Sequence, residues 1–278
     1  MAPNRWAGTD RRSDQAPKAS FDVTVPNVAR IYDYFLGGKD NFAADREAAE
    51  ELRSLLPDAG IACRENRAFL RRAVRYLASD PGIGQFIDIG SGLPTADNTH
   101  EIAQEIRPDA RVAYVDYDPV VVAHGRALLE SSPNVAVIEA DLRRPGVIVG
   151  SQSLADLVDF SAPVAILLTA VLHFIPDDED PYGIVDILRC VMAPGSYLVI
   201  SHATQDDVSR EETLGGMSIY DKASAPMIPR GHGDVLKFFG RMDLIHPGLV
   251  NISEWRSGQR HPRRPVRGLI YGGVARKP

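Results

Sequence analysis

Short apolar runs alternate with stretches of helical periodicity from residue 85 onward, and this alternation constrains the fold more than any other feature of the chain. The runs are mostly rich in Val, Ile or Tyr and bounded by Gly, Pro or Asp, which predicts strands over residues 85–89, 112–116, 135–139, 164–168 and 197–201. Helices are predicted between them over residues 99–107, 119–130 and 181–192. The pattern is typical of an α/β fold in which a doubly wound, mostly parallel sheet carries helices on both faces.

The two ends of the chain have different patterns. Residues 26–80 predict a helix that starts near Pro26 and ends at Gly37-Gly38, then helices over residues 45–56 and 64–77. Residues 249–255 and 268–275 predict two strands joined by a polar loop, a hairpin at the edge of the sheet. We therefore predict three parts: a disordered or mobile arm (1–25), a helical cap (26–80) and an α/β domain (81–278).

Composition excludes several other classes of protein. A chain of 278 residues with 44% hydrophobic side chains can bury a core, which a disordered chain cannot. The longest apolar stretch, residues 164–175, is shorter than the roughly 20 residues of a membrane span, and residues 1–20 lack the apolar segment of a secretory signal. We expect a cytoplasmic protein without a membrane partner. Cys63 and Cys190 are expected to be reduced, buried thiols, in neither a disulfide nor a metal site.

Charge is concentrated in the middle of the chain. The net charge is −6, but residues 81–202 carry 6 Lys and Arg against 17 Asp and Glu, a net charge of −11. Because nucleic-acid-binding domains are more often basic, a nucleic-acid partner is not expected. Residues 256–267 hold five arginines, which predict either a solvated hairpin loop or a contact with an anion.

A glycine turn follows the first predicted strand. Gly90-Ser91-Gly92 would let a ligand approach the backbone closely at the carboxyl end of that strand. The dinucleotide fingerprint is incomplete, because its third small residue falls on Thr95. The carboxylate of Asp88 would repel a pyrophosphate and suits a cation, such as the amino group and sulfonium of S-adenosylmethionine. The alternative is that Asp88 caps the turn.

Carboxylates also follow the second and third strands. Asp116 is placed to accept hydrogen bonds from ribose hydroxyls, which NAD and S-adenosylmethionine both carry. Asp118 is predicted as the N-cap of the helix that Pro119 opens. Asp141 would accept a hydrogen bond from an adenine amino group, or else is an acid in a surface loop.

Taken together, these segments resemble the successive cofactor motifs of class I S-adenosylmethionine-dependent methyltransferases. The motifs are residues 88–92, 115–119 and 140–142, and residues 168–177 and 193–201 resemble that superfamily's fourth and fifth strand segments. Residues 26–46 resemble, more specifically, one bacterial family of S-adenosyl methyltransferases whose methyl acceptor is unknown. The resemblance implies a seven-stranded Rossmann-like sheet of order 3-2-1-4-5-7-6. It also implies a cofactor site that includes Gly90, Ser91, Gly92, Tyr117, Leu142 and Thr169 beside the three carboxylates.

Other residues are candidates for the acceptor side. His173, just past the fourth strand, is the predicted general base, and the alternative is a structural histidine. A second candidate is a lid of Tyr32, Tyr34 and Lys39 hinged at Gly37-Gly38, in which Tyr32 and Lys39 would contact the cofactor; the alternative is plain helix packing. A third candidate is an acceptor pocket that Arg230 and His232 would line.

The sequence thus predicts an S-adenosylmethionine-dependent methyltransferase that acts on a small molecule. Two alternatives stay open: an NAD-dependent oxidoreductase, which Asp88 and Thr95 disfavour, and an S-adenosylmethionine-binding regulator without catalysis. No Asn-Pro-Pro-Tyr follows the fourth strand, so methylation of nucleobase or glutamine amino groups is not predicted. The methyl acceptor and the oligomeric state, including a homodimer, are left open.

Overall fold

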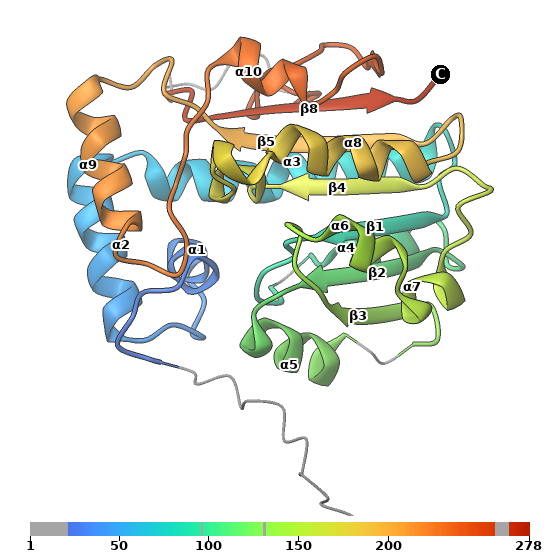
Figure 1. The fold of residues 1–278 in the computed structure, drawn as a ribbon, viewed down its shortest axis with the longest axis horizontal. Coiled ribbons are helices and arrows are strands. Elements are labelled where there is room, and N and C mark those ends of the chain that lie inside the picture. The colour runs from blue at the N-terminus through green and yellow to red at the C-terminus, as the bar shows by residue number, and fades with distance from the viewer. Residues whose placement is uncertain (1–21, 96, 130–131, 259–266) are drawn as a thin grey trace, which may run out of the picture.

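The computed structural model describes residues 22–95, 97–129, 132–258 and 267–278. Within these residues, eight strands form one sheet of order β3-β2-β1-β4-β5-β8-β6, and β7 pairs with β8 as well (Figure 1). The strands are β1 (Gln85–Ile89), β2 (Arg111–Asp116), β3 (Val135–Glu139), β4 (Ala165–Thr169), β5 (Tyr197–Ala203), β6 (Asp243–Leu244), β7 (Val250–Asn251) and β8 (Ile270–Arg276).

The sheet is doubly wound and mostly parallel, as predicted. Strands β1 to β5 are parallel, whereas β8 is antiparallel to β5. The five strands predicted between residues 85 and 201 are confirmed, and none of their ends differs from the prediction by more than two residues. The predicted hairpin is confirmed only in part. Its first strand is the two-residue β7, and β8 does not form the edge, because the unpredicted strand β6 also pairs with it.

The helices are α1 (Val28–Leu36), α2 (Ala43–Leu55), α3 (Ala59–Ser79), α4 (Thr99–Gln104), α5 (Pro119–Leu128), α6 (Pro145–Val149), α7 (Gln152–Leu157), α8 (Pro181–Val191), α9 (Arg210–Tyr220) and α10 (His232–Lys237). Two short 3-10 helices, η1 (Leu172–Phe174) and η2 (Asp177–Glu179), follow β4. The predicted N-cap of α5 is confirmed, because Asp118 Oδ1 accepts from the backbone N–H of Val120 at 2.8 Å.

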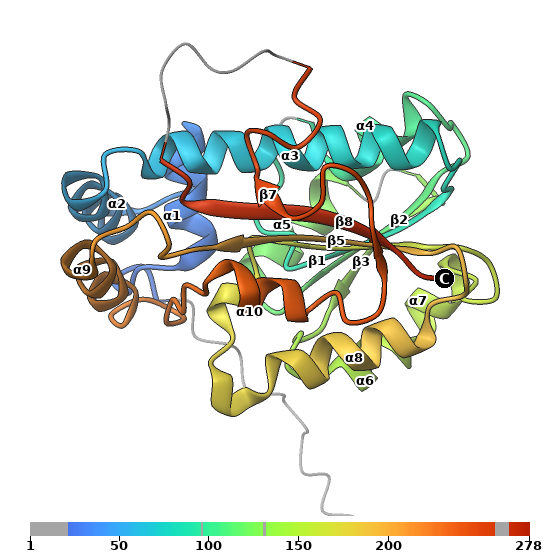
Figure 2. The ribbon, with the colours of Figure 1, turned by 90° about the horizontal axis from the view of Figure 1, so that it is seen from above.

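Helices cover both faces of the sheet. Seen from above, α3 and α4 lie on one face and α6, α8 and α10 on the other (Figure 2). Strand β1 has apolar residues on both of its faces: Phe86 packs into the core on the α3 side, whereas Ile87 and Ile89 pack into the core on the other face. Strands of a parallel sheet that are buried on both faces need this composition.

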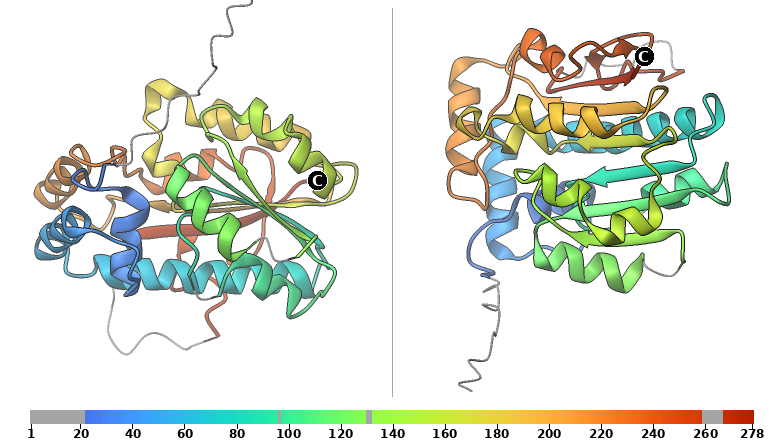
Figure 3. Two further views of the ribbon diagram at one scale, coloured as in Figure 1. Left: turned by 90° about the horizontal axis from the view of Figure 1, so that it is seen from below. Right: turned by 45° about the vertical axis from the view of Figure 1, so that its right-hand side comes forward.

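A third core cluster lies beyond the carboxyl ends of the strands. It joins α1, α2 and α9 through side chains that include Ile31, Phe35, Leu52, Ile219 and Tyr220. Figures 1 and 3 both show these three helices stacked at one end of the sheet. Helix α9 therefore packs with α1 and α2 although it lies far along the sequence. Helix α3, which the sequence predicts as part of the helical cap, instead packs its apolar face on the sheet.

Other predictions from the sequence concern the two cysteines, the N-terminal arm, the arginine-rich loop and membrane spans. Cys63 is half-buried, but Cys190 is exposed, so the prediction of two buried thiols is wrong for Cys190. The predicted arm falls almost wholly on residues 1–21, and most of the arginine-rich loop on residues 259–266, both outside the described residues. Of the helices in the described ranges, none has the length and apolar character needed to cross a membrane.

Candidate functional site

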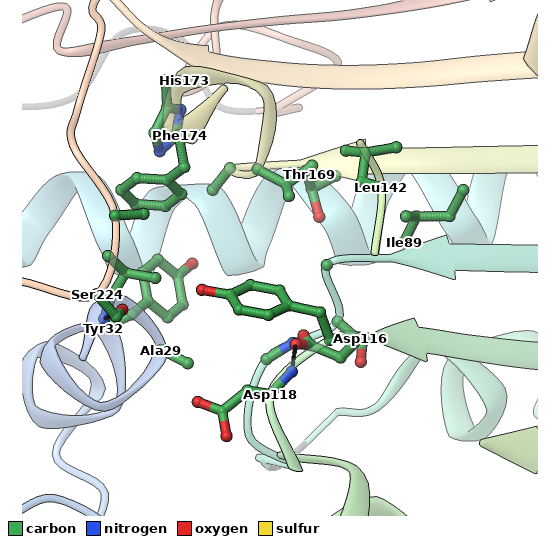
Figure 4. Close-up of a pocket in the computed structure, with 18 of the residues that line it drawn as sticks. Ala29, Tyr32, Ile89, Asp116, Asp118, Leu142, Thr169, His173, Phe174 and Ser224 are labelled. Atoms are coloured by element: carbon green, nitrogen blue, oxygen red, sulfur yellow. Dashed lines mark hydrogen bonds between the residues drawn. The ribbon is translucent and has the colours of Figure 1, made fainter. Parts of the chain in front are cut away.

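A cavity of about 270 Å³ lies at the carboxyl ends of β1 to β4. Figure 4 shows its two sides. Ile89, Asp116, Leu142 and Thr169 come from the ends of strands or the loops after them. Ala29, Tyr32, His173, Phe174 and Ser224 face them from α1, η1 and the segment after α9. This is the edge at which open α/β sheets bind their ligands.

The glycine turn forms the floor of the cavity beside β2. The backbone N–H groups of Gly90 and Ser91 donate to Val115 O at 2.8 and 3.3 Å. Gly90 has a φ of 71°, and a Cβ there would lie 2.4 Å from Val171 Cγ2. Only glycine fits this position, which explains the residue that the sequence places there.

Asp116 lies beneath the turn and is 8% exposed. Its Oδ2 accepts from Gly92 N at 2.9 Å, and its Oδ1 accepts from Asp118 N at 3.0 Å. Burial raises the pKa of Asp116 to about 6, although these backbone donors act in the opposite direction. Each carboxylate oxygen can accept a second hydrogen bond, so Asp116 can still bind a hydroxyl in the cavity.

Asp88 lines the cavity but is already hydrogen-bonded. Thr99 Oγ1, on the first residue of α4, donates to Asp88 Oδ2 at 2.7 Å. Burial raises the pKa of Asp88, against the effect of this hydrogen bond. The carboxylate therefore ties α4 to β1, a role that the sequence did not suggest, and it still faces the cavity.

Asp141 forms an ion pair at the cavity rim. Its carboxylate accepts from the backbone N–H, Nε and Nη2 of Arg143 at 2.7 to 3.0 Å. Burial works to raise the pKa of Asp141, but the hydrogen bonds from Arg143 outweigh it and lower the pKa. The Arg143 guanidinium also lies 5.7 Å from the centre of the Tyr117 ring, so Arg143 contacts both Tyr117 and Asp141.

We call α1 together with residues 221–231 the roof of the cavity. Asn27 caps α1 through Oδ1, and its Nδ2 donates to Asp118 Oδ2 at 2.7 Å, which ties the roof to the end of β2. Ser224 N donates to Pro26 O at 2.9 Å, and Ile228 N donates to His173 O at 2.7 Å. The roof therefore joins elements that are far apart in the sequence.

The structure divides the predicted lid. Tyr32 lines the cavity, and its hydroxyl donates to Cys63 O at 3.0 Å and accepts from Asn66 Nδ2 at 2.9 Å. Tyr34 instead bonds Glu50 on α2, and Lys39 is exposed and does not line the cavity. The prediction that these three side chains form one lid is wrong, because Tyr32 and Tyr34 point in different directions from α1 and Lys39 lies beyond the end of that helix.

Arg230 and His232 do not line the cavity. Arg230 is buried and donates to Leu172 O, Ile175 O and the carboxylate of Asp177. One ring nitrogen of His232 lies 3.0 Å from Leu249 O. Arg230 holds the segment after β4, and His232 contacts the residue before β7, so the predicted acceptor pocket at these residues is wrong.

His173 does line the cavity and is 3% exposed. Ala203 N donates to its Nδ1 at 3.1 Å. Burial lowers its pKa well below the usual range, and nearby His202 and Arg230 lower it further. The ring is neutral at pH 7. The general-base role of His173 stays a prediction. Because Nδ1 accepts from Ala203 N, the proton of the neutral ring lies on Nε2, which can donate a hydrogen bond.

Sequence reasoning missed other residues around the cavity: Asn27, Asn66, Phe174, Tyr220, Ser224 and Met227. Asn27 carried a signal, since it precedes the first helix and is a good N-cap residue. The others carried none. Asn66, for example, accepts from Ser201 Oγ at 2.5 Å, a contact between residues 135 positions apart.

Comparisons with known proteins agree with this geometry. Residues 14–278 match the family model described as S-adenosyl methyltransferase. A predicted methyltransferase of Thermobifida fusca is 39% identical, with a TM-score of 0.87 over 95% of this chain and 99% of that one. A DUF574 family protein of Streptomyces avermitilis is also 39% identical, with a TM-score of 0.86 over 92% and 99% of the two chains. No curated protein matches the chain.

The family match spans nearly the whole chain, and both solved structures are similar over almost their full length. The resemblance inferred from residues 26–46 and from the strand-end motifs is thereby confirmed. The chain belongs to the S-adenosyl methyltransferase family and is an S-adenosylmethionine-dependent methyltransferase.

Proposed function

We propose that the enzyme methylates a small molecule that is held in the cavity together with the cofactor. The main support for this proposal is that the roof, α1 together with residues 221–231, covers the cavity. The roof's contacts with Asp118 and with His173 O hold it over a cavity of about 270 Å³, just below the roughly 300–1,000 Å³ of small-molecule sites. Such a cover favours an acceptor small enough to enter the cavity.

The cofactor half of the cavity is proposed to lie at the glycine turn. S-adenosylmethionine supplies a methyl group activated by a sulfonium. The residues present suit this group, because Asp116 retains acceptor capacity for ribose hydroxyls and the carboxyl group of Asp88 lines the same space, where an ionised form would attract a cation. Ser91, Tyr117, Leu142 and Thr169 complete this half of the lining.

The protein's own contribution is proposed to be alignment. Walls from β1, β4, η1 and the roof surround one space, so two bound molecules would be held at fixed relative positions. Holding reactants in this way can supply roughly 7–11 kcal/mol of a barrier.

Thermal unfolding with S-adenosylhomocysteine, and separately with NAD, tests the cofactor half. Saturation at about 100 times the dissociation constant adds about 2.7 kcal/mol to stability, which should raise the midpoint by several degrees. We expect the shift with S-adenosylhomocysteine only. A shift with NAD alone would contradict the proposal.

The acceptor class is tested with S-adenosylmethionine that carries a labelled methyl group. The enzyme is incubated with a bacterial extract, and the products are separated by size. We expect label in the small-molecule fraction that depends on the enzyme. Label confined to protein or nucleic acid would contradict a small-molecule acceptor and leave the cofactor result intact.

A further inference from the structure

One end of the cavity is apolar. We call Cys63, Phe174, Tyr220 and Met227 the apolar wall, because all four line the cavity and belong to the core cluster of α1, α2 and α9. The rings of Phe174 and Tyr220 lie 5.8 Å apart, centre to centre. Figure 4 shows Phe174 and His173 across the open space from Leu142 and Ile89, at the end away from the strand tips.

The ionisable groups of the apolar wall are neutral at pH 7. Burial raises the pKa of the Cys63 thiol to about 12 and raises that of the Tyr220 phenol as well. Asp33, the carboxylate of α1 that also lines the cavity, accepts from Asp40 N at 3.0 Å and Asn41 Nδ2 at 2.8 Å. A charged group packed on the four side chains of the wall would lose water without gaining a counter-ion from them, which is costly. The charged side chains that line the cavity, Asp33 and Arg67 among them, are not part of this wall. The wall therefore favours an uncharged ligand.

His173 adds one polar atom to this apolar end. A backbone N–H can only donate, so Nδ1 is the acceptor from Ala203 and the proton of the neutral ring sits on Nε2. Nε2 makes no hydrogen bond to any residue that the structure describes. In the same residues, Trp255 Nε1 is the one fully buried side-chain polar atom without a partner, so Nε2 keeps accessible surface on the cavity.

We propose that the methyl acceptor is an uncharged, flat and largely apolar molecule that packs on the apolar wall and accepts a hydrogen bond from His173 Nε2–H. This inference rests on the proposed function, since the acceptor must share the cavity with the cofactor. Flat rings suit the wall because aromatic pairs gain energy from stacked or edge-on contacts. His173 is then a binding residue that orients the acceptor, and its proton-bearing Nε2 does not act as a base.

Four bicyclic probes test the acceptor class by ligand-observed NMR at pH 7.5, with and without S-adenosylhomocysteine. Quinoline is neutral with one ring nitrogen that accepts a hydrogen bond, and naphthalene has the same shape without it. The 2-naphthoate and 2-naphthylmethylammonium ions add one negative or positive charge. We expect quinoline to bind about 3- to 10-fold more tightly than naphthalene, the effect of one hydrogen bond. Both ions should bind at least tenfold more weakly than quinoline.

Two variants assign the preference to His173. His173→Phe removes the donor and should abolish the preference for quinoline over naphthalene. His173→Gln can accept from Ala203 N with one amide atom and donate with the other, so it should keep most of that preference. A residue that only supported the fold would change the affinity for both probes equally, and S-adenosylhomocysteine binding controls for folding of both variants.

Several outcomes would overturn the inference. They are equal binding of either ion, no preference for quinoline in the wild-type protein, a preference that survives in His173→Phe, or no binding of either neutral probe. Absence of S-adenosylhomocysteine binding alone would overturn the proposed cofactor site instead. The ranking of the probes without it would still test the apolar wall.

Discussion

At the scale of single residues, Asp116 is where burial and the proposed cofactor contact act on the same carboxyl group. Its pKa of about 6 in the folded protein lies above that of an unfolded aspartate, so its ionisation disfavours folding. Its contribution to stability is therefore greatest below about pH 4 and is lost as the pH rises through about 6. Cofactor binding has the opposite dependence, because the ionised carboxylate is the better acceptor.

We predict that the affinity for S-adenosylhomocysteine falls as the pH drops below 6, approaching tenfold per pH unit. Calorimetric titrations between pH 5 and 8 measure it. Asp116→Asn should bind more weakly at pH 8 and should lose the pH dependence in this range. A slope that persists in Asp116→Asn would assign the titration to another group, such as Asp88.

Gly90 and Gly92 form a matched pair for the turn. Both have positive φ, but a Cβ at Gly92 meets nothing within 4 Å, whereas at Gly90 it would overlap Val171. Gly92→Ala should cost about 1–2 kcal/mol of backbone strain. Gly90→Ala should cost more and displace the turn, with a clear loss of S-adenosylhomocysteine affinity. Equal effects in urea unfolding and in binding would contradict the role of the Val171 contact.

At the scale of elements, the position of α1 depends on a buried ion pair with α2. Arg30 Nε lies 2.7 Å from Asp45 Oδ2, with side chains 4% and 0% exposed. Asp45 Oδ1 also accepts from Asn27 N at 2.8 Å, so one carboxylate holds both the N-cap and the side of α1. The segment of residues 26–46 that resembled a specific family is therefore one connected unit beside the cavity.

Asp45→Ala should destabilise the protein by about 3–5 kcal/mol, because it removes the carboxylate that balances a buried guanidinium. The control is Arg53→Ala, which breaks an exposed pair with Glu50 on the same helix and should cost less than about 1 kcal/mol. Urea unfolding monitored by circular dichroism measures both. Similar losses for the two variants would show that the buried pair is not specially important.

At the scale of the whole molecule, the roof, α3 and the sheet form one connected structure. Ser201 Oγ on β5 donates to Asn66 on α3, and Asn66 donates to Tyr32 on α1. Together with the contact of Asn27 to Asp118, these bonds couple the roof to the edge of the sheet where the cofactor is proposed to bind. Ligand binding should therefore stabilise segments that are distant in the sequence.

We predict that S-adenosylhomocysteine slows amide hydrogen exchange in three separate segments: α1, residues 221–231 and residues 90–95. Helices α6 and α7, which do not line the cavity, serve as the internal control and should change little. Mass spectrometry of peptides after exchange measures this. Protection limited to residues 90–95 would show that the roof opens and closes independently of the ligand.

The sequence by itself determined the sheet and its glycine turn. Strands such as β1 are short and buried on both faces, so their composition alone reveals them, and Asp118 has a local role as the N-cap of α5. Gly90 is required partly by its own positive φ and partly by Val171, which lies far along the chain. It also carried the motifs that led to the family. Strand β6, with two residues, is too short to give such a signal.

Only the tertiary structure decided which residues share the cavity. Tyr32 and Lys39 stand close together in the sequence, yet one lines the cavity and the other is exposed. Phe174, Tyr220 and Met227 reach the same wall from separate segments, and Ala203 determines which nitrogen of His173 carries the proton. Such contacts depend on packing between elements far apart in the chain. Local patterns report the burial of a residue, but they do not report its partner.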